Sequence, residues 1–278
     1  MLALKKVKKN FNKNTATEKI AIDIESLNIE KGEVVTVVGG NGSGKTTLLN
    51  LIAGSYIADE GQIFIDGVEV TGIPEHKRAK YIGRVFQNPL LGTAPSMTIE
   101  ENLAMAQLRG NRRGLAWGVS RKQRQQYRHL LSTLGLGLEY RLKDPVHLLS
   151  GGERQALTIL MATLSTPKLL LLDEHTASLD PKTASIVMEL TEKIVCKTSL
   201  TTIMVTHSMH EAIAYGNRII MLHEGRIKLD LSGKEKNVLT VEELVTNFGV
   251  RLANNTMFAP VPTTLAYKDC LNREVDDA

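Results

Sequence analysis

The hydrophobic positions of this 278-residue chain fall into short runs separated by segments with helical spacing. Residues 34–38, 169–172 and 202–206 are continuous apolar or β-branched runs, which is typical of strands buried on both faces of a parallel sheet. Apolar residues with helical spacing follow the first run and precede the second. This alternation predicts an α/β fold in which helices cover both faces of a parallel sheet.

The first part of the chain shows a different pattern. Ile20, Ile22 and Ile24 alternate with other residues, which predicts strands that precede the first buried run. Residues 61–70 predict a hairpin that turns at Asp66 and Gly67, because Asp-Gly suits a two-residue turn. We therefore expect an N-terminal antiparallel β subdomain.

Three helix starts can be predicted from capping residues. Thr98 with Glu101, and Ser208 with Glu211, have the spacing of a capping box. Asp180 precedes Pro181, so Asp180 is expected to be the N-cap and Pro181 the first helical residue.

Between residues 109 and 128 the chain is basic, contains no acidic residue and includes Trp117. The solvated face of a helical insert is the favoured interpretation. Contact with anionic lipid headgroups or with a partner is the alternative, and nucleic-acid binding has little support because no recognition helix is evident. The basic residues are Arg109, Arg112, Arg113, Arg121, Lys122, Arg124 and Arg128.

Composition limits the remaining possibilities. The formal net charge of +4 is mild, and it does not by itself indicate a nucleic-acid partner. Cys196 and Cys270 lie far apart without metal-ligand spacing, which fits a reducing cytosolic compartment. The sequence has no apolar run of the ~18–20 residues needed to span a bilayer, and its start lacks a signal-peptide core. A membrane role would therefore require a partner that supplies the span.

The chemistry centres on residues 39–47, GGNGSGKTT, which follow the strand at 34–38 and precede a helical segment. This is the context of a phosphate-binding loop. Its glycines allow backbone N–H groups to surround an anion, and the helix N-terminus adds positive potential. Lys45 is expected to reach the β- and γ-phosphates, and the Thr46 hydroxyl to hold Mg2+. A glycine-rich turn with a solvent-facing lysine is the weaker alternative.

Asp173 and Glu174 end the apolar run at 169–172. In phosphate-loop enzymes an Asp at such a strand end orients Mg2+, and Glu174 is placed to act as a general base for the attacking water. A surface acidic pair is the alternative. His207 similarly follows the strand at 202–206, just before a helix.

These motifs together resemble the ABC-type ATPase family, specifically the nucleotide-binding subunit of an ABC transporter. GGNGSGKTT resembles its Walker A loop, LSGGERQ at 149–155 its signature motif, and LLLLDE its Walker B strand. Gln87 matches the Q-loop, residues 177–180 match the D-loop, and His207 matches the switch histidine. Phe11 stands where the family has an adenine-stacking aromatic residue.

The resemblance implies a set of site residues. It implies catalytic roles for Glu174, His207, Gln87 and Lys45, and Mg2+ contacts for Thr46, Gln87 and Asp173. The residues implied to bind ATP are Phe11, Gly39, Gly40, Asn41, Gly42, Ser43, Gly44, Lys45, Thr46, Thr47, Ser150, Gly151, Gly152 and Asp180.

The resemblance also implies partners. In the family two cassettes pack head to tail, so that residues 150–152 of one copy complete the site of the other, and a homodimer is expected here. A transmembrane permease subunit and an extracytoplasmic substrate-binding protein are the other expected partners. The chain would then lie peripherally at the cytoplasmic face of the cell membrane. Import is favoured over export.

Two positions depart from the family pattern. His175 stands where the family usually has proline, and Glu153 replaces the commoner glutamine. Neither side chain is expected to touch phosphate, and His175 has no cluster of neighbouring ligands that would suit a metal. The resulting DEHT sequence resembles importer ATPases that work with lipoprotein-type binding proteins, so amino acids are candidate cargo.

The expected architecture is a phosphate-loop NTPase core with a parallel sheet, an N-terminal antiparallel β subdomain and a helical signature subdomain. Residues 1–230 would form the ATPase domain, with the helical subdomain inserted at about 98–165, and residues 231–278 a short helical or irregular tail. The alternative function is that of a soluble ABC ATPase acting on ribosomes or nucleic acid.

Overall fold

The computed structural model describes residues 1–110 and 119–238, together with residues 240 and 243. Arg112, Arg113, Trp117, Cys270 and most of the helix expected at 241–245 lie outside the described residues. The chain divides into two compact units, of which the first comprises Met1–Arg78 and Val195–Ala278 and the second comprises Ala79–Ile194.

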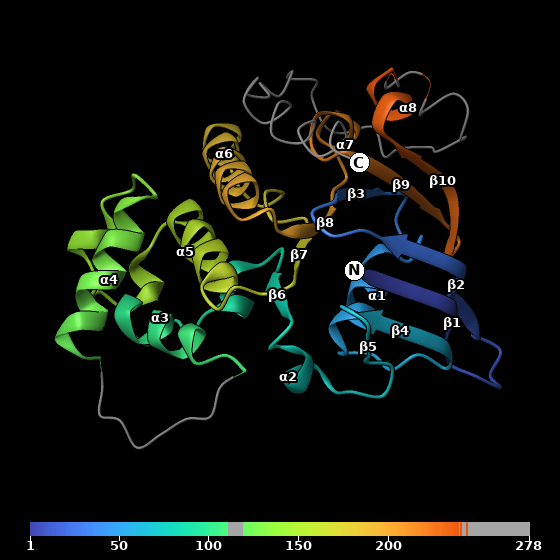
Figure 1. Ribbon diagram of the computed structural model, residues 1–278, viewed down its shortest axis with the longest axis horizontal. Coiled ribbons are helices and arrows are strands. Elements are labelled where there is room, and N and C mark those ends of the chain that lie inside the picture. Colours follow the sequence, from blue (N-terminus) through green and yellow to red (C-terminus); the bar gives the residue numbers. More distant parts are fainter. Residues whose placement is uncertain (111–118, 239, 241–242, 244–278) are drawn as a thin grey trace. The chain divides into compact units, whose positions relative to one another are not determined.

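The first unit contains an antiparallel sheet built from the N-terminal residues (Figure 1). Its strands are ordered β2-β1-β4-β5, with β1 at Leu2–Phe11, β2 at Lys19–Ile29, β4 at Glu60–Ile65 and β5 at Val68–Glu69. Asp66 and Gly67 both have positive φ, 52° and 77°, as the predicted Asp-Gly turn between β4 and β5 requires. The predicted antiparallel subdomain is confirmed.

The first unit also contains parallel strands. β3 (Val34–Val38) pairs in parallel with β8 (Thr201–Val205) and with β9 (Arg218–His223), while β10 (Arg226–Ser232) is antiparallel to β9. β3 and β8 are buried at every residue, which explains their unbroken apolar sequence. The helices of this unit are α1 (Lys45–Ala53), α2 (Glu75–Arg78), α7 (Met209–Ala214) and α8 (Gly233–Asn237).

The C-terminal end of α1 is held by a buried arginine. Arg78 is fully buried, and its guanidinium donates to the carbonyl oxygens of Leu51 at 2.7 Å and Ile52 at 2.9 Å. It also donates to the carbonyls of Thr71 and Ile73. A cation at the carbonyl end of a helix is favourable because the helix dipole is negative there. Burial lowers the pKa of Arg78 to about 10, so it remains charged at neutral pH.

The second unit pairs two parallel strands with a helical region (Figure 1). β6 (Ile82–Val85) pairs with β7 (Leu169–Asp173). The helices are α3 (Ile99–Gln107), α4 (Arg121–Ser132), α5 (Gly151–Thr163) and α6 (Pro181–Thr198), the last of which continues into the first unit. Short 3-10 turns lie at Pro89–Gly92, Leu138–Tyr140 and Val146–Leu148. Parallel strands with helices and an antiparallel subdomain confirm the predicted α/β class.

The helical region has its own apolar core. Ile99, Leu103, Tyr127, Leu131 and Leu157 are fully buried in it. The predicted Thr98–Glu101 capping box begins α3. On α4, Arg124 forms an ion pair with Glu100 of α3 at 2.5 Å, whereas Arg121, Lys122 and Arg128 are exposed. In the described part of the basic stretch, charged residues therefore form the exposed face of α4, a helix that packs into this core.

Candidate nucleotide-binding site

The glycine-rich loop lies between β3 and α1, as the sequence predicts. Helix α1 begins at Lys45, and its N-cap is Gly44, whose φ of 107° is open to glycine but rarely to other residues. The backbone N–H groups of the first turn of a helix have no intrahelical partners. The loop and the helix start together form an anion-binding geometry.

The shape of this loop is fixed by contacts with other parts of the first unit. A Cβ on Gly39 would lie 2.3 Å from the carbonyl oxygen of Leu222, and one on Gly44 would lie 2.6 Å from that of Ala21. The Gly225 N–H donates to the Ser43 carbonyl at 2.9 Å, and the Asp23 N–H donates to the Gly225 carbonyl at the same distance. The β9–β10 turn and β2 therefore support the loop from behind.

Lys45 is nearly buried, at 5% exposed. Its Nζ donates to the carbonyl oxygens of Gly39 at 2.9 Å and Gly40 at 3.1 Å. These bonds hold the positive charge within the loop. Thr46, in the first turn of α1, is exposed, as are Asn41 and Gly42.

Phe11 ends β1 and contacts Tyr56, which follows α1 in the sequence. The ring centroids are 5.3 Å apart and the ring planes meet at 75°. The Lys9 Nζ lies 5.8 Å from the centroid of the Phe11 ring. Phe11 is half-buried and Tyr56 is 39% exposed. The sequence indicated Phe11 but gave no sign of Tyr56 as its neighbour.

His207 follows β8 and is exposed. The capping box predicted for Ser208 and Glu211 is only half formed. The Glu211 N–H donates to the Ser208 Oγ at 3.2 Å, but the Glu211 carboxylate accepts from the Thr206 hydroxyl. The Ser208 N–H also donates to that hydroxyl oxygen, at 3.1 Å. The predicted capping box does not close, because the Thr206 hydroxyl bonds to both the Glu211 carboxylate and the Ser208 N–H. His207 therefore lies within a hydrogen-bonded turn.

In the second unit, β7 ends at Asp173, and Glu174 follows. The two residues are 8% and 9% exposed. The Arg84 Nη2 lies 3.9 Å from the Asp173 Oδ2. Glu174 has a φ of 45°, a left-handed conformation that costs an L-residue about 1–2 kcal/mol. Such strain persists only where the surrounding structure enforces it.

His175 directly follows Asp173 and Glu174 in the sequence and is 2% exposed. Its Nε2 is 3.3 Å from the Thr191 Oγ1, and that hydroxyl donates to the Val187 carbonyl at 2.8 Å. Because the hydroxyl has only one hydrogen, it accepts from His175, which assigns a hydrogen to Nε2. Burial lowers the pKa of His175 to about 4. At neutral pH it is an uncharged imidazole that links the end of β7 to α6.

The segment at 149–155 begins α5. Ser150 is its N-cap, and Glu153 completes a capping box, in which the Ser150 N–H donates to the Glu153 Oε2 at 2.7 Å and the Glu153 N–H to the Ser150 Oγ at 3.3 Å. The Arg141 guanidinium donates to the Glu153 Oε1 at 2.9 Å. Ser150 and Gly151 are exposed. The Ser-x-x-Glu spacing of residues 150–153 is the sequence signal for this capping role of Glu153.

The N-termini of α5 and α6 lie against each other. A Cβ on Gly152 would approach the Thr183 Cγ2 to 2.0 Å, so a glycine permits the contact. The Asp180 Oδ1 accepts from the Thr183 N–H at 3.1 Å, which confirms the predicted N-cap. Hydrogen bonds from the Thr183 side chain and backbone lower the pKa of Asp180. The Ser178 Oγ donates to the carbonyl oxygen of Gln87 at 3.4 Å. Gln87 itself is exposed.

The predicted site residues thus fall into two groups. The first unit holds Phe11, the loop at 39–47 and His207. The second unit holds Gln87, residues 150–152, Asp173, Glu174 and Asp180, and within it Gln87 lies beside the segment that leads to Asp180.

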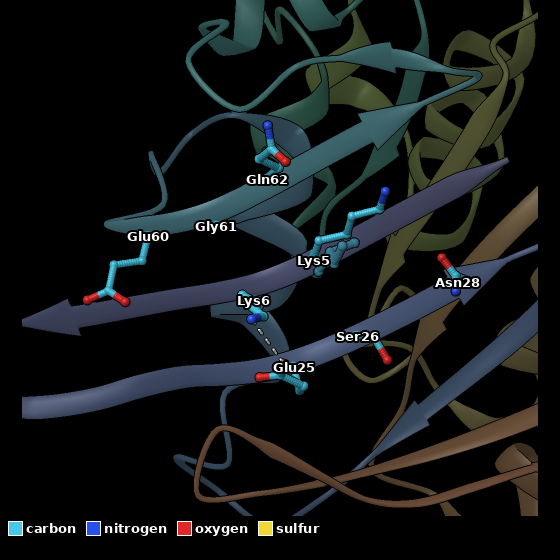
Figure 2. A pocket seen from close by; sticks show the side chains of 9 residues that line it. Lys5, Lys6, Glu25, Ser26, Asn28, Glu60, Gly61 and Gln62 are labelled. Carbon is cyan, nitrogen blue, oxygen red and sulfur yellow. Dashed lines mark ion pairs between the residues drawn. The ribbon is translucent and has the colours of Figure 1, made fainter.

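A surface hollow of about 680 Å³ lies elsewhere, on the antiparallel sheet (Figure 2). It is lined by residues of β1, β2 and β4, and the Lys6 Nζ lies 3.9 Å from the Glu25 Oε1 across it. None of the predicted nucleotide-binding residues lines this hollow. It is therefore separate from the phosphate loop.

Known proteins share these features. The ABC transporter family model matches residues 22–177. A tyrosine transport ATP-binding protein of Clostridioides difficile is 46% identical over 89% of this chain and 98% of its own length. The methionine import ATP-binding protein MetN of Bartonella henselae is 35% identical over 86% of this chain and 67% of its own length. The solved structure of the ATP-binding cassette MJ0796, a dimer bound to ADP and Pi, has a TM-score of 0.71 and 30% identity, and the match covers 84% of this chain and 98% of that one.

The strand, loop and helix around Lys45 define a phosphate-loop nucleotide-binding protein. The chain belongs to the ABC transporter family, as an ATP-binding subunit whose ATP hydrolysis is coupled to transport. No helix within the described residues is both long and apolar enough to cross a membrane.

Proposed function

We propose that this chain binds ATP at the loop of residues 39–47 and hydrolyses it to drive import. The loop N–H groups and the N-terminus of α1 receive the phosphates. Lys45 exchanges its loop carbonyls for the β- and γ-phosphate oxygens, which are stronger acceptors because they are charged. Phe11 stacks on the adenine.

Mg2+ fits the residues proposed to hold it. Thr46, Gln87 and Asp173 offer hydroxyl, amide and carboxylate oxygens, the hard ligands that this ion prefers. Asp173 is also buried beside Arg84, so its carboxylate is held in place. When held by these residues, the ion would supply positive charge to the β- and γ-phosphates.

Glu174 is the proposed general base, which accepts a proton from the water that attacks the γ-phosphate. Its position is restricted by the left-handed turn and by burial of the adjacent His175. His207, on the loop after β8, is proposed to contact the γ-phosphate. A restricted base is favourable because catalysis depends on correct placement of the reacting groups.

A second copy is proposed to complete the site. The N-terminus of α5 is exposed at Ser150 and Gly151, so its N–H groups and dipole are available to a phosphate. Ser150 accepts a hydrogen bond from Glu153, which leaves its hydroxyl hydrogen available to donate. Gly152 and Asp180 are proposed to border the same phosphate. The solved MJ0796 cassette is dimeric, which supports this arrangement.

The observation that carries the proposal is the buried Glu174, which directly follows β7. We expect Glu174→Gln to lower ATP turnover by at least about 100-fold, because a general base contributes about 10²–10⁴-fold, while leaving ATP affinity intact. Lys45→Ala should instead weaken ATP binding. The matched control is Glu189→Gln, at an exposed ion pair on α6, which should retain normal turnover. Wild-type turnover in Glu174→Gln would contradict the assignment.

The cargo is proposed to be an amino acid, and tyrosine first, because the 46% identical relative is named a tyrosine transport protein. A transmembrane permease and an extracytoplasmic binding protein would complete the importer, with this chain at the cytoplasmic face of the membrane. Uptake of labelled tyrosine by cells carrying Glu174→Gln in place of the wild type should fall to background. Unchanged tyrosine uptake together with lost methionine uptake would reassign the cargo.

A further inference from the structure

The Tyr56 ring contacts the Phe11 ring, although the two residues come from distant parts of the chain. Phe11 ends β1, and Tyr56 lies within the connection from α1 to β4. Their rings meet edge to face, at 5.3 Å and 75°, which is a favourable geometry for an aromatic pair. The contact lies within the first unit.

Several hydrogen bonds hold the two segments together. The Lys9 Nζ donates to the Ile57 carbonyl at 2.9 Å. The Asn10 N–H donates to the Asp59 Oδ2 at 2.7 Å, and the Asp59 N–H donates to the Lys8 carbonyl at 2.9 Å. These bonds join the residues just before Phe11 to the residues just after Tyr56, and they fix the register between β1 and the connection. The segment that carries Tyr56 is therefore held against the end of β1.

Tyr56 is also attached to the phosphate-loop helix. Helix α1 ends at Ala53 and is capped by Gly54, which has a left-handed φ of 88°. The N–H groups of Gly54 and Tyr56 both donate to the Asn50 carbonyl, at 2.9 Å and 3.1 Å. One short helix thus presents the phosphate-binding loop at its start and Tyr56 just beyond its end. The spacing between phosphate recognition and this aromatic residue is set by a single rigid element.

The aromatic pair is not an interior contact. Tyr56 is 39% exposed, the adjacent Ile57 is 45% exposed, and Phe11 is only half-buried. Aromatic residues that pack solely to fill a core are usually more deeply buried. Two perpendicular rings with accessible surface are suited to a planar heteroaromatic ligand, which stacks on one ring while the other prevents that ring from turning.

We propose that Tyr56 is a positioning residue of the nucleobase site, which acts by holding the Phe11 ring in the orientation that stacks on adenine. This inference rests on the proposed role of Phe11. Replacing Tyr56 with a smaller, non-aromatic residue frees the Phe11 ring and weakens recognition of the base. Recognition of the triphosphate, which depends on the loop at 39–47, is unaffected.

The test compares two probes of the full-length protein, ATP and inorganic triphosphate, which lacks a base. Tyr56→Leu should raise the Kd and KM for ATP about 3- to 10-fold, the range expected from the loss of an aromatic pair, with kcat and triphosphate affinity unchanged. Tyr56→Phe keeps the ring and should restore ATP affinity. The matched control is Tyr140→Leu, at a tyrosine that is 88% exposed in the second unit, and it should leave both affinities unchanged.

The outcomes separate this inference from the function on which it rests. If Phe11→Leu weakens ATP binding and Tyr56→Leu does not, the inference is wrong and the proposed base site stands. If Phe11→Leu also has no effect on the ratio of ATP to triphosphate affinity, the base assignment itself fails. Equal weakening of both probes by Tyr56→Leu would show a general structural role and would also overturn the inference. In the Phe11→Leu background, Tyr56→Leu should have no further effect, since Tyr56 acts through Phe11.

Discussion

His175 is buried in an uncharged form directly after the proposed general base. Its imidazole contacts the Thr191 hydroxyl on α6 and not a carboxylate, so nothing in this contact favours protonation. The sequence marked His175 as unusual but could not reveal its role, because Thr191 lies on another element, 16 residues later. Its burial predicts a dependence of stability on pH.

We expect the free energy of unfolding to decrease as the pH falls from about 6.5 toward 4. The pKa of His175 is lowered from its ordinary value of 6.5 to about 4, so between these values the unfolded chain binds a proton that the folded chain does not. The contribution is constant above pH 6.5 and is lost below it, by up to about 3 kcal/mol at pH 4. Urea unfolding at several pH values measures it.

Other groups titrate in this range, so the comparison must use variants. His175→Phe should remove the part of the pH slope due to His175. His129→Gln, at an exposed histidine on α4, should leave the slope as in the wild type. A His175→Phe slope identical to that of the wild type would show that His175 titrates normally in the folded protein.

How much can be predicted at this scale depends on whether a residue's role is local. The loop at 39–47 and the N-caps at Thr98 and Asp180 were predictable, because each depends on neighbours within a few positions. Glu153 carried an equally local signal, since Ser-x-x-Glu marks a capping box. Tyr56 and Arg78 carried none, because their partners are set by the folded backbone.

At the scale of elements, the N-termini of α5 and α6 are in direct contact at Gly152. An alanine there would favour the helix by up to about 1 kcal/mol. There is no room for an alanine side chain at position 152, however, because its Cβ would lie 2.0 Å from the Thr183 Cγ2. Steric overlap of this kind costs about 1–3 kcal/mol, so the clash should exceed the gain in helix propensity.

Gly152→Ala is therefore expected to lower the free energy of unfolding by about 1–2 kcal/mol. Thr183→Ser removes the clashing methyl group, so the double variant should recover most of the loss. Gly151→Ala is the control, since its Cβ would meet its nearest neighbour, the Leu179 Cδ2, at an ordinary 3.4 Å. Denaturant unfolding of the wild type, the two single variants, the double variant and Gly151→Ala is sufficient, and additive effects of Gly152→Ala and Thr183→Ser would rule out this contact as the cause.

The strands were the most predictable elements. β3, β7 and β8 are buried at every residue, and burial on both faces requires the apolar runs that the sequence displays. The half-formed cap at Ser208 was predicted less well, because the Thr206 hydroxyl competes for both of its groups. Such competition depends on geometry that residue spacing does not specify.

At the scale of the whole molecule, the predicted site residues are distributed over two units. The first carries the phosphate loop and the second carries both Glu174 and the exposed N-terminus of α5. Because each copy would supply a loop and a helix N-terminus, two copies could bind two nucleotides between them. ATP would then act as a shared ligand that stabilises the dimer.

We expect Glu174→Gln to elute from a sizing column at twice the monomer mass when ATP and Mg2+ are present, and as a monomer without them. Slow hydrolysis leaves the shared ligand in place. Adding Ser150→Asp should abolish this dimer, because a carboxylate repels the γ-phosphate.

Aspartate caps a helix about as well as serine, so Ser150→Asp should leave the fold and stability of the monomer unchanged. Loss of the dimer would then reflect the charge at the phosphate and not a damaged helix. An ATP-dependent dimer that persists in the Ser150→Asp protein would contradict the shared site.

The support of the phosphate loop by the β9–β10 turn has a thermodynamic consequence. Hydrogen bonds to Ser43 and Gly225, and backbone packed tightly against Gly39 and Gly44, define the loop conformation in the protein alone. The nucleotide therefore binds a loop that already has its binding conformation, so binding costs little conformational entropy of the chain. Calorimetry of ATP binding should register a largely enthalpic signal, dominated by Lys45 exchanging carbonyl partners for phosphate.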